Sequence, residues 1–195
     1  RWAFQWKVAA PQLQGLIPGL NGSIASVGQL TGPRDQPEIA ADFTVQNLSY
    51  GETRIQQLRG ETRFDAGGAN RSKLQILGQG LTLGGQQWKI LTLDGAGTPA
   101  AHEIKIELAG EPGRFNVALA GNLQLPALIW QGRIAQLAMK DTVAGAWTLD
   151  KPAALQASAK EASLDAACLD SAPTRLCLRS EERRVGKSVD LGGRR

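Results

Sequence analysis

The residues best suited to chemistry in this sequence lie together in the stretch HEIKIELAG. His102 is the only histidine of the chain, and Glu103 and Glu107 follow it with Lys105 between them. A catalytic triad or a metal site needs several such groups that converge from different elements, and the chain has no second histidine. Alternation in this stretch puts Glu103, Lys105 and Glu107 on a solvated strand face. We therefore expect no catalytic residue, no metal site, no cofactor and no enzymatic activity, and we interpret His102 as a strand-edge histidine.

The glycine-rich stretch GQGLTLGG is a weak candidate for a phosphate-binding loop. Its glycines stand near the required spacing, but neither a Lys-Ser/Thr pair nor a helical pattern follows them. We interpret these glycines as turn and bulge residues.

Two cysteines lie near the end of the chain, in LDAACLDSAPTRLCL. If Leu169 pairs with Leu176 across a hairpin, Cys168 falls opposite Cys177 on the same face. A disulfide there would contribute roughly 3 kcal/mol in the chain-entropy model, and it would indicate an oxidising compartment. The alternative is a pair of unrelated buried thiols.

The net charge is concentrated at the C-terminal end. The chain has 22 Lys/Arg and 18 Asp/Glu, and residues 179–195 hold six of the former and three of the latter. Residues 1–178 therefore carry 16 basic and 15 acidic side chains. Because a protein that binds phosphate backbones needs a clear basic excess, we expect no nucleic-acid partner.

Apolar and polar residues alternate through most of the chain, as in the run of Ile104, Ile106 and Leu108. Turn signals such as TGPRDQP, DAGGAN and DGAGTP separate the runs about every ten residues. This pattern predicts an all-β fold, an antiparallel meander of about a dozen strands, with at most one short helix, within residues 11–20. Between Trp130 and Met139 the alternation changes phase, which predicts a bulge.

Strands that are apolar on one face can bury that face in two ways. They can pack as two sheets in a sandwich, which is the commoner soluble outcome, or curl into a gutter that leaves the face open to a ligand. Periodicity alone leaves both arrangements open.

Several phrases, taken in order, carry a family resemblance. They are WKVAAPQLQGLIPGLNGSI, GQLTGP, PEIAADFTVQNLSY, HEIKIELAGEPGRFNVALAGNL, WQGRIAQLAM, GAWTLDKPAAL and LDAACLDSAPTRLCL. Together they resemble the periplasmic repeat region of the TamB family, in the AsmA-like superfamily of bridge-like lipid transfer proteins. The resemblance covers nearly all of residues 1–178 and favours the gutter over the sandwich.

The resemblance implies a long, curved antiparallel sheet with an open apolar groove, a β-taco-like shape. It also implies transfer of phospholipids between the inner and outer membranes and support of outer-membrane protein assembly with the barrel partner TamA. The expected location is the periplasm of a Gram-negative bacterium. We interpret the sequence as an internal segment and expect an inner-membrane anchor outside it, because it has no run of about 18 apolar residues. The alternative is a structural β-solenoid or spacer domain of a cell-envelope protein without lipid cargo.

Acyl chains need only an apolar surface, because each buried CH₂ contributes about 0.8 kcal/mol without directional contacts. The candidate groove residues are therefore those on the apolar strand faces. They are Phe43, Val45, Leu74, Ile76, Ile104, Ile106, Leu108, Phe115, Val117 and Leu119.

The stretch RSEERRVGKSVDLGGRR, residues 179–195, departs from the family pattern and resembles the translation of a common sequencing adapter. It shows no apolar alternation, so we expect residues 1–178 to form the groove region and residues 179–195 to be a non-native, unstructured tail. The alternative is a genuine basic tail that binds anionic lipid or nucleic acid.

Overall fold

The computed structural model describes residues 1–15 and 17–179. The prediction for residues 179–195 therefore lies outside the described residues, apart from Arg179. The regular elements of the described chain are β-strands and one 3₁₀ helix, η1 (Leu13–Gly15), which takes the place of the short helix expected near the start.

Fourteen strands form one sheet. They are β1 (Trp2–Ala10), β2 (Asn21–Gly32), β3 (Glu38–Tyr50), β4 (Thr53–Asp65), β5 (Ser72–Leu83), β6 (Gln86–Thr98), β7 (Ala101–Gly110), β8 (Gly113–Gln124), β9 (Ile129–Thr142), β10 (Gly145–Leu149), β11 (Ala153–Ala157), β12 (Ala162–Leu164), β13 (Ala167–Ser171) and β14 (Thr174–Leu178).

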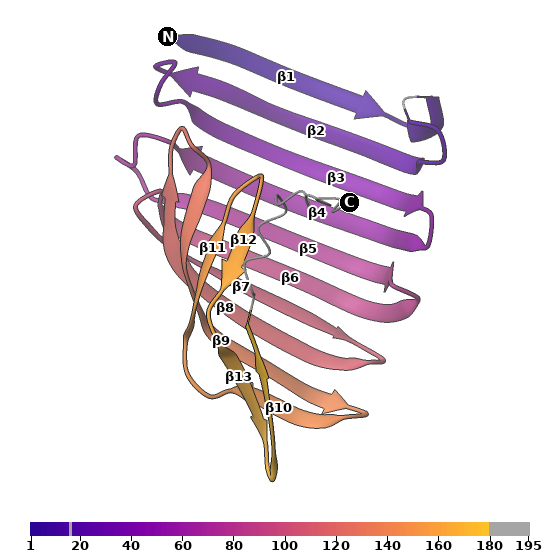
Figure 1. The fold of residues 1–195 in the computed structure, drawn as a ribbon. Helices are drawn as coiled ribbons and strands as arrows, with labels where there is room; N and C mark the ends of the chain where they lie inside the picture. Colours follow the sequence, from indigo (N-terminus) through magenta and orange to yellow (C-terminus); the bar gives the residue numbers. More distant parts are fainter. Residues whose placement is uncertain (16, 180–195) are drawn as a thin grey trace, which may run out of the picture.

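Strands β1 to β10 follow one another across the sheet in chain order, and every pairing is antiparallel. Figure 1 shows β1 to β8 stacked side by side from the N-terminal edge. The sheet does not close into a barrel, since β1 pairs with β2 alone among the described strands. This confirms the all-β fold and the antiparallel meander, with a curved open sheet in place of the sandwich that periodicity alone also allowed.

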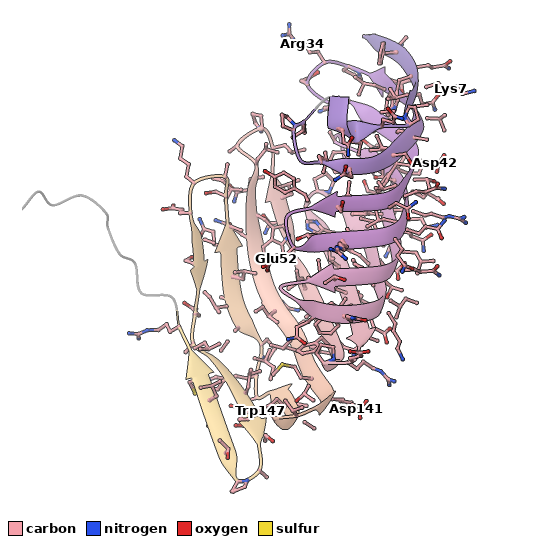
Figure 2. The ribbon with its side chains drawn as sticks, turned by 90° about the vertical axis from the view of Figure 1, so that its right-hand side faces the viewer. Lys7, Arg34, Asp42, Glu52, Asp141 and Trp147 are labelled. Carbon is pink, nitrogen blue, oxygen red and sulfur yellow. A yellow bond between two sulfur atoms is a disulfide. The ribbon has the colours of Figure 1, made fainter. Side chains whose placement is uncertain are left out.

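Residues opposite each other in an antiparallel pair point to the same side, so the register sorts all side chains onto two faces. We call the side that carries Ile104, Ile106 and Leu108 the apolar face, and the other side, with Lys7 and Asp42, the outer face. Figure 2 shows Lys7 and Asp42 projecting from the outer side of the bent sheet.

The sheet forks at β9. The first half of this strand pairs with β11, from Trp130 to Ile134, and its second half pairs with β10. One branch continues as β11–β12 and the other as β10–β13–β14. Three of the few buried apolar side chains lie on the two branches: Ala153 on β11, and Ala167 and Leu169 on β13.

The predicted bulge is confirmed. In the pairing of β8 with β9, Ala118 lies opposite Gln136 whereas Leu119 lies opposite Ile134, so Ala135 is the extra residue. This residue falls inside the interval from Trp130 to Met139, where the alternation changes phase. Because Ala135 is an extra residue, Ile134 before it and Leu137 after it both point to the apolar face.

Candidate functional site

The ten candidate groove residues share the apolar face. On β7, Ile104, Ile106 and Leu108 lie opposite the three candidates of β8, Leu119, Val117 and Phe115. These six side chains therefore form a continuous block.

The other four candidates extend this block across the sheet. Ile76 of β5 is joined to Ile106 through Leu93 of β6, and Phe43 of β3 is joined to Ile76 through Gly60 of β4. We call side chains that lie opposite one another on successive strands a row. Val45 and Leu74 lie in the rows next to that of Ile76 and Phe43, at the positions opposite Leu58 and Gly95. The candidates are thus members of one surface that crosses six strands, β3 to β8.

Several residues of this surface were missed by the sequence reasoning. Leu91 and Leu93 of β6 complete the rows of Leu108 and Ile106, and Leu137 and Met139 of β9 extend them. The run ILTLD contains the same alternation as the neighbouring strands, so period-two counting could have found β6. Leu58, also missed, stands as one apolar residue between polar neighbours and gives no such signal.

The apolar face is not covered by a second layer of the described chain. Nine of the ten candidates are half-buried, and Val45 is 9% exposed. The extensive contacts between elements are those between neighbouring strands and between η1 and β2. Lateral packing within the face therefore hides part of each side chain and leaves the rest open.

Aromatic side chains lie flat against glycines of the adjacent strand. Trp6 covers Gly28, where a Cβ atom would come within 2.2 Å of the indole, and Phe43 covers Gly60, where it would come within 2.1 Å of the ring. Since each pair is directly opposite across the strands, the missing side chain makes room for the ring. We call the hollow side of the curved sheet, which the apolar face lines, the trough. The rings fill the space over the glycines and do not project into the trough, so the apolar face stays shallow and open.

A third aromatic residue, Trp130 of β9, lies over Gly121 and Gly132 and reaches His102 of β7. The indole Nε1–H donates a 2.8 Å hydrogen bond to His102 Nε2, and His102 Nδ1 lies 3.1 Å from the carbonyl oxygen of Thr98. These partners assign the proton of the neutral ring to Nδ1, which donates to the carbonyl. Both ring nitrogens of His102, the second residue of β7, are therefore used within the fold.

The carboxylates beside His102 lie on the outer face. Glu103 is opposite Ala96 and Ala120, and Glu107 is opposite Thr92 and Asn116; both glutamates are exposed. In the parts of the chain that the structure describes, no three His, Cys, Asp or Glu side chains come together as a metal site would require.

Ion pairs and polar pairs bridge adjacent strands of the outer face. Arg63 lies 3.8 Å from Asp42, and Lys73 lies 3.5 Å from Glu61. These side chains are about half exposed, so each pair contributes little to stability, on the order of 0–1 kcal/mol. Their effect is to keep one face of the sheet hydrated while the other is apolar.

The turn between β4 and β5 is built around Asp65, whose side chain is buried. The Asn70 backbone N–H, 2.7 Å from Oδ2, is the main cause that lowers the pKa of Asp65 below its ordinary value. The Asn70 side-chain amide and the N–H groups of Gly67 and Gly68 act in the same direction, while burial opposes them. The ionised carboxylate therefore organises this turn.

The C-terminal hairpin contains the expected disulfide. Cys168 lies opposite Cys177 and Leu169 opposite Leu176, and the two sulfurs are bonded. The two cysteines are nine positions apart in sequence and join β13 to β14, the last two strands of the branch β10–β13–β14.

Comparison with known proteins identifies a family for this chain. The family model described as TamB, N-terminal domain, matches residues 1–190, and so extends into the stretch 179–195. No solved structure matches this chain. Within the described residues, no helix is both long and apolar enough to span a membrane.

Proposed function

We propose a function from one established premise: the chain belongs to the TamB family, whose N-terminal-domain model matches residues 1–190. In this proposal the apolar face is a conduit along which phospholipid acyl chains move between the inner and outer membranes. The protein also supports outer-membrane protein assembly together with the barrel partner TamA.

One observation carries the proposal. The apolar face runs without interruption from β3 to β8, and nine of its ten candidate residues keep part of their surface exposed. A soluble protein that exposes an apolar surface of this extent usually has a ligand or partner for it. A row of aliphatic side chains suits acyl chains, because burial of CH₂ groups at about 0.8 kcal/mol each requires no directional contact.

The mechanism that follows is passive. Acyl chains lie against the apolar face while head groups remain in water, and the absence of directional contacts lets the chains slide from one row to the next. No covalent step is required, so we propose that the protein is not an enzyme.

The location and the partner belong to the same proposal. We place the chain in the periplasm of a Gram-negative bacterium, anchored in the inner membrane by a segment outside this sequence. The disulfide between Cys168 and Cys177 suits an oxidising compartment of this kind. Co-purification of TamA with the intact protein tests the partner.

The alternative of a β-solenoid is less well supported, because solenoid coils stack strands in parallel, whereas every pairing here is antiparallel. One experiment distinguishes the conduit from a spacer without lipid cargo. We would place a photoreactive amino acid at Ile106 of the intact protein in cells, with the neighbouring Lys105, on the outer face, as the control.

Lipid adducts at Ile106 and none at Lys105, identified by mass spectrometry after digestion, are the expected result. Protein adducts at Ile106 without lipid at either position would mean that the apolar face is covered by another polypeptide. In that case the spacer function would replace the conduit.

A further inference from the structure

A pocket of about 300 Å³ lies at one end of the apolar face, near the turn from β6 to β7. Phe64 borders it on the side of β4, and Trp130 with His102 borders it on the side of β9. Between them, Leu74, Gly95 and Ile104 contribute to its lining. Leu74 and Ile104 also belong to the rows of the apolar face, so the pocket is continuous with the trough.

The polar side chains of Ser72, Thr98, His102 and Trp130, which line this pocket, are already engaged within the protein. The Trp130 indole N–H and both ring nitrogens of His102 are paired with each other or with the backbone. The hydroxyls of Ser72 and Thr98 accept backbone N–H groups at 3.0 Å and 3.3 Å. Among the described residues, no buried side-chain nitrogen or oxygen lacks a partner. Apart from the hydroxyl of Thr62, a ligand in this pocket therefore meets mainly hydrocarbon.

The charged residues beside the pocket face the other way. Arg63 and Lys73 contribute to its border, but the register puts both on the outer face, where they pair with Asp42 and Glu61. Glu103 is on the outer face as well. Among the described residues that line the pocket, no cation is turned into it, so the pocket offers no group that would hold the phosphate or carboxylate of a lipid head group.

We propose that this pocket seats the methyl end of a single acyl chain, which gives the trough a defined holding position for its cargo. The inference rests on the proposed function, since the chain reaches the pocket along the rows that contain Leu74 and Ile104. The volume of the pocket is at the lower end of the range for ligand pockets, about 300–1,000 Å³. Such a volume suits the end of one acyl chain better than a whole lipid.

Gly95 allows the pocket to be filled without disturbing the backbone. A Cβ atom at this position would lie 3.4 Å from Leu74 Cβ and 3.8 Å from Ile104 Cγ1, which is ordinary van der Waals contact. Its neighbour Gly97 has a positive φ of 140° and would place a Cβ atom 2.3 Å from a carbonyl oxygen, so it is unsuitable. Gly95→Leu therefore puts a side chain into the pocket, and Ala118→Leu, on the outer face opposite Lys105 and Gln136, is the matched control.

The test uses the intact protein and palmitic acid with a diazirine at its terminal carbon. After irradiation, adducts are mapped by mass spectrometry to the pocket, at Phe64 and Trp130, and to the central rows, at Ile76 and Ile106. We expect adducts at both places in the unaltered protein and in Ala118→Leu. In Gly95→Leu the pocket adducts should fall several-fold while those of the central rows persist.

Two results would overturn the holding position, and they are distinguishable. Adducts confined to the central rows, unaffected by Gly95→Leu, would remove the pocket and leave the conduit intact. The absence of adducts on the apolar face altogether would remove both, and circular dichroism of Gly95→Leu verifies that the variant is folded in either case.

Discussion

The aromatic ring of Phe43 lies so close to Gly60 that adding one methyl group should dislodge it. In Gly60→Ala the new Cβ would stand 2.1 Å from Phe43 Cζ and 2.3 Å from Cε1, whereas carbon atoms in contact are about 3.5–4.0 Å apart. The ring must swing away from β4 into the trough. Overpacking of this kind costs about 1–3 kcal/mol, while replacing glycine in a strand recovers about 0.4–1 kcal/mol of backbone entropy. We therefore expect Gly60→Ala to lower the free energy of unfolding by about 1 kcal/mol, within a range of about 0–2.6 kcal/mol.

Urea unfolding followed by circular dichroism measures this loss. Gly95→Ala is the matched control, because its Cβ atom makes only ordinary contacts and the entropy gain should leave the protein as stable as before or slightly more so. In the double variant Gly60→Ala/Phe43→Ala the clash is absent, so the two changes should be coupled by about 1 kcal/mol or more. Two results would refute this reasoning. One is a free energy of unfolding for Gly60→Ala as high as that for Gly95→Ala. The other is a double variant in which the effects of the two changes simply add, because either result would mean that the position of the Phe43 ring does not require glycine at position 60.

Three further predictions concern the turn, the hairpin and the histidine. Because the folded-state pKa of Asp65 lies below the unfolded value of about 3.9, its carboxylate stabilises the fold above about pH 4, and this stabilisation is lost as the pH falls through the folded pKa. Asp65→Asn should therefore lower the urea midpoint at neutral pH and flatten its decline in acid. Reduction of the bridge between Cys168 and Cys177 should cost about 3 kcal/mol, seen as a lower midpoint with dithiothreitol, and Cys168→Ser should show no further response to the reductant. His102→Leu leaves the indole N–H of Trp130 without its acceptor and should cost about 1–3 kcal/mol in thermal unfolding, part of which Trp130→Phe should restore.

The strands and the bulge could be predicted from the sequence, because period-two alternation reports directly on which side chains share a face. The opposition of Cys168 and Cys177 could be predicted for the same reason, since the hairpin that joins them is local. Both inferences needed only neighbouring residues along the chain.

The fork and the hydrogen bond between Trp130 and His102 could not be predicted in this way. At the fork, β10 pairs with the second half of β9 and β11 pairs with the first half. No local sequence pattern encodes this choice, because it depends on strands that compete for the same long partner. Trp130 and His102 are 28 residues apart and meet only because β8, which lies between them, carries glycine at position 121. The sequence identified His102 as a strand residue but not its partner.

The fork also determines how the sheet yields to force. From β1 to β8 each strand is held by its two neighbours or, at β1, by one, so this part of the sheet can bend or peel strand by strand like a repeat array. At β9 the strand is held by three others, namely β8, β10 and β11. Force applied between the first eight strands and either branch must therefore pass through β9, because no other described strand joins them.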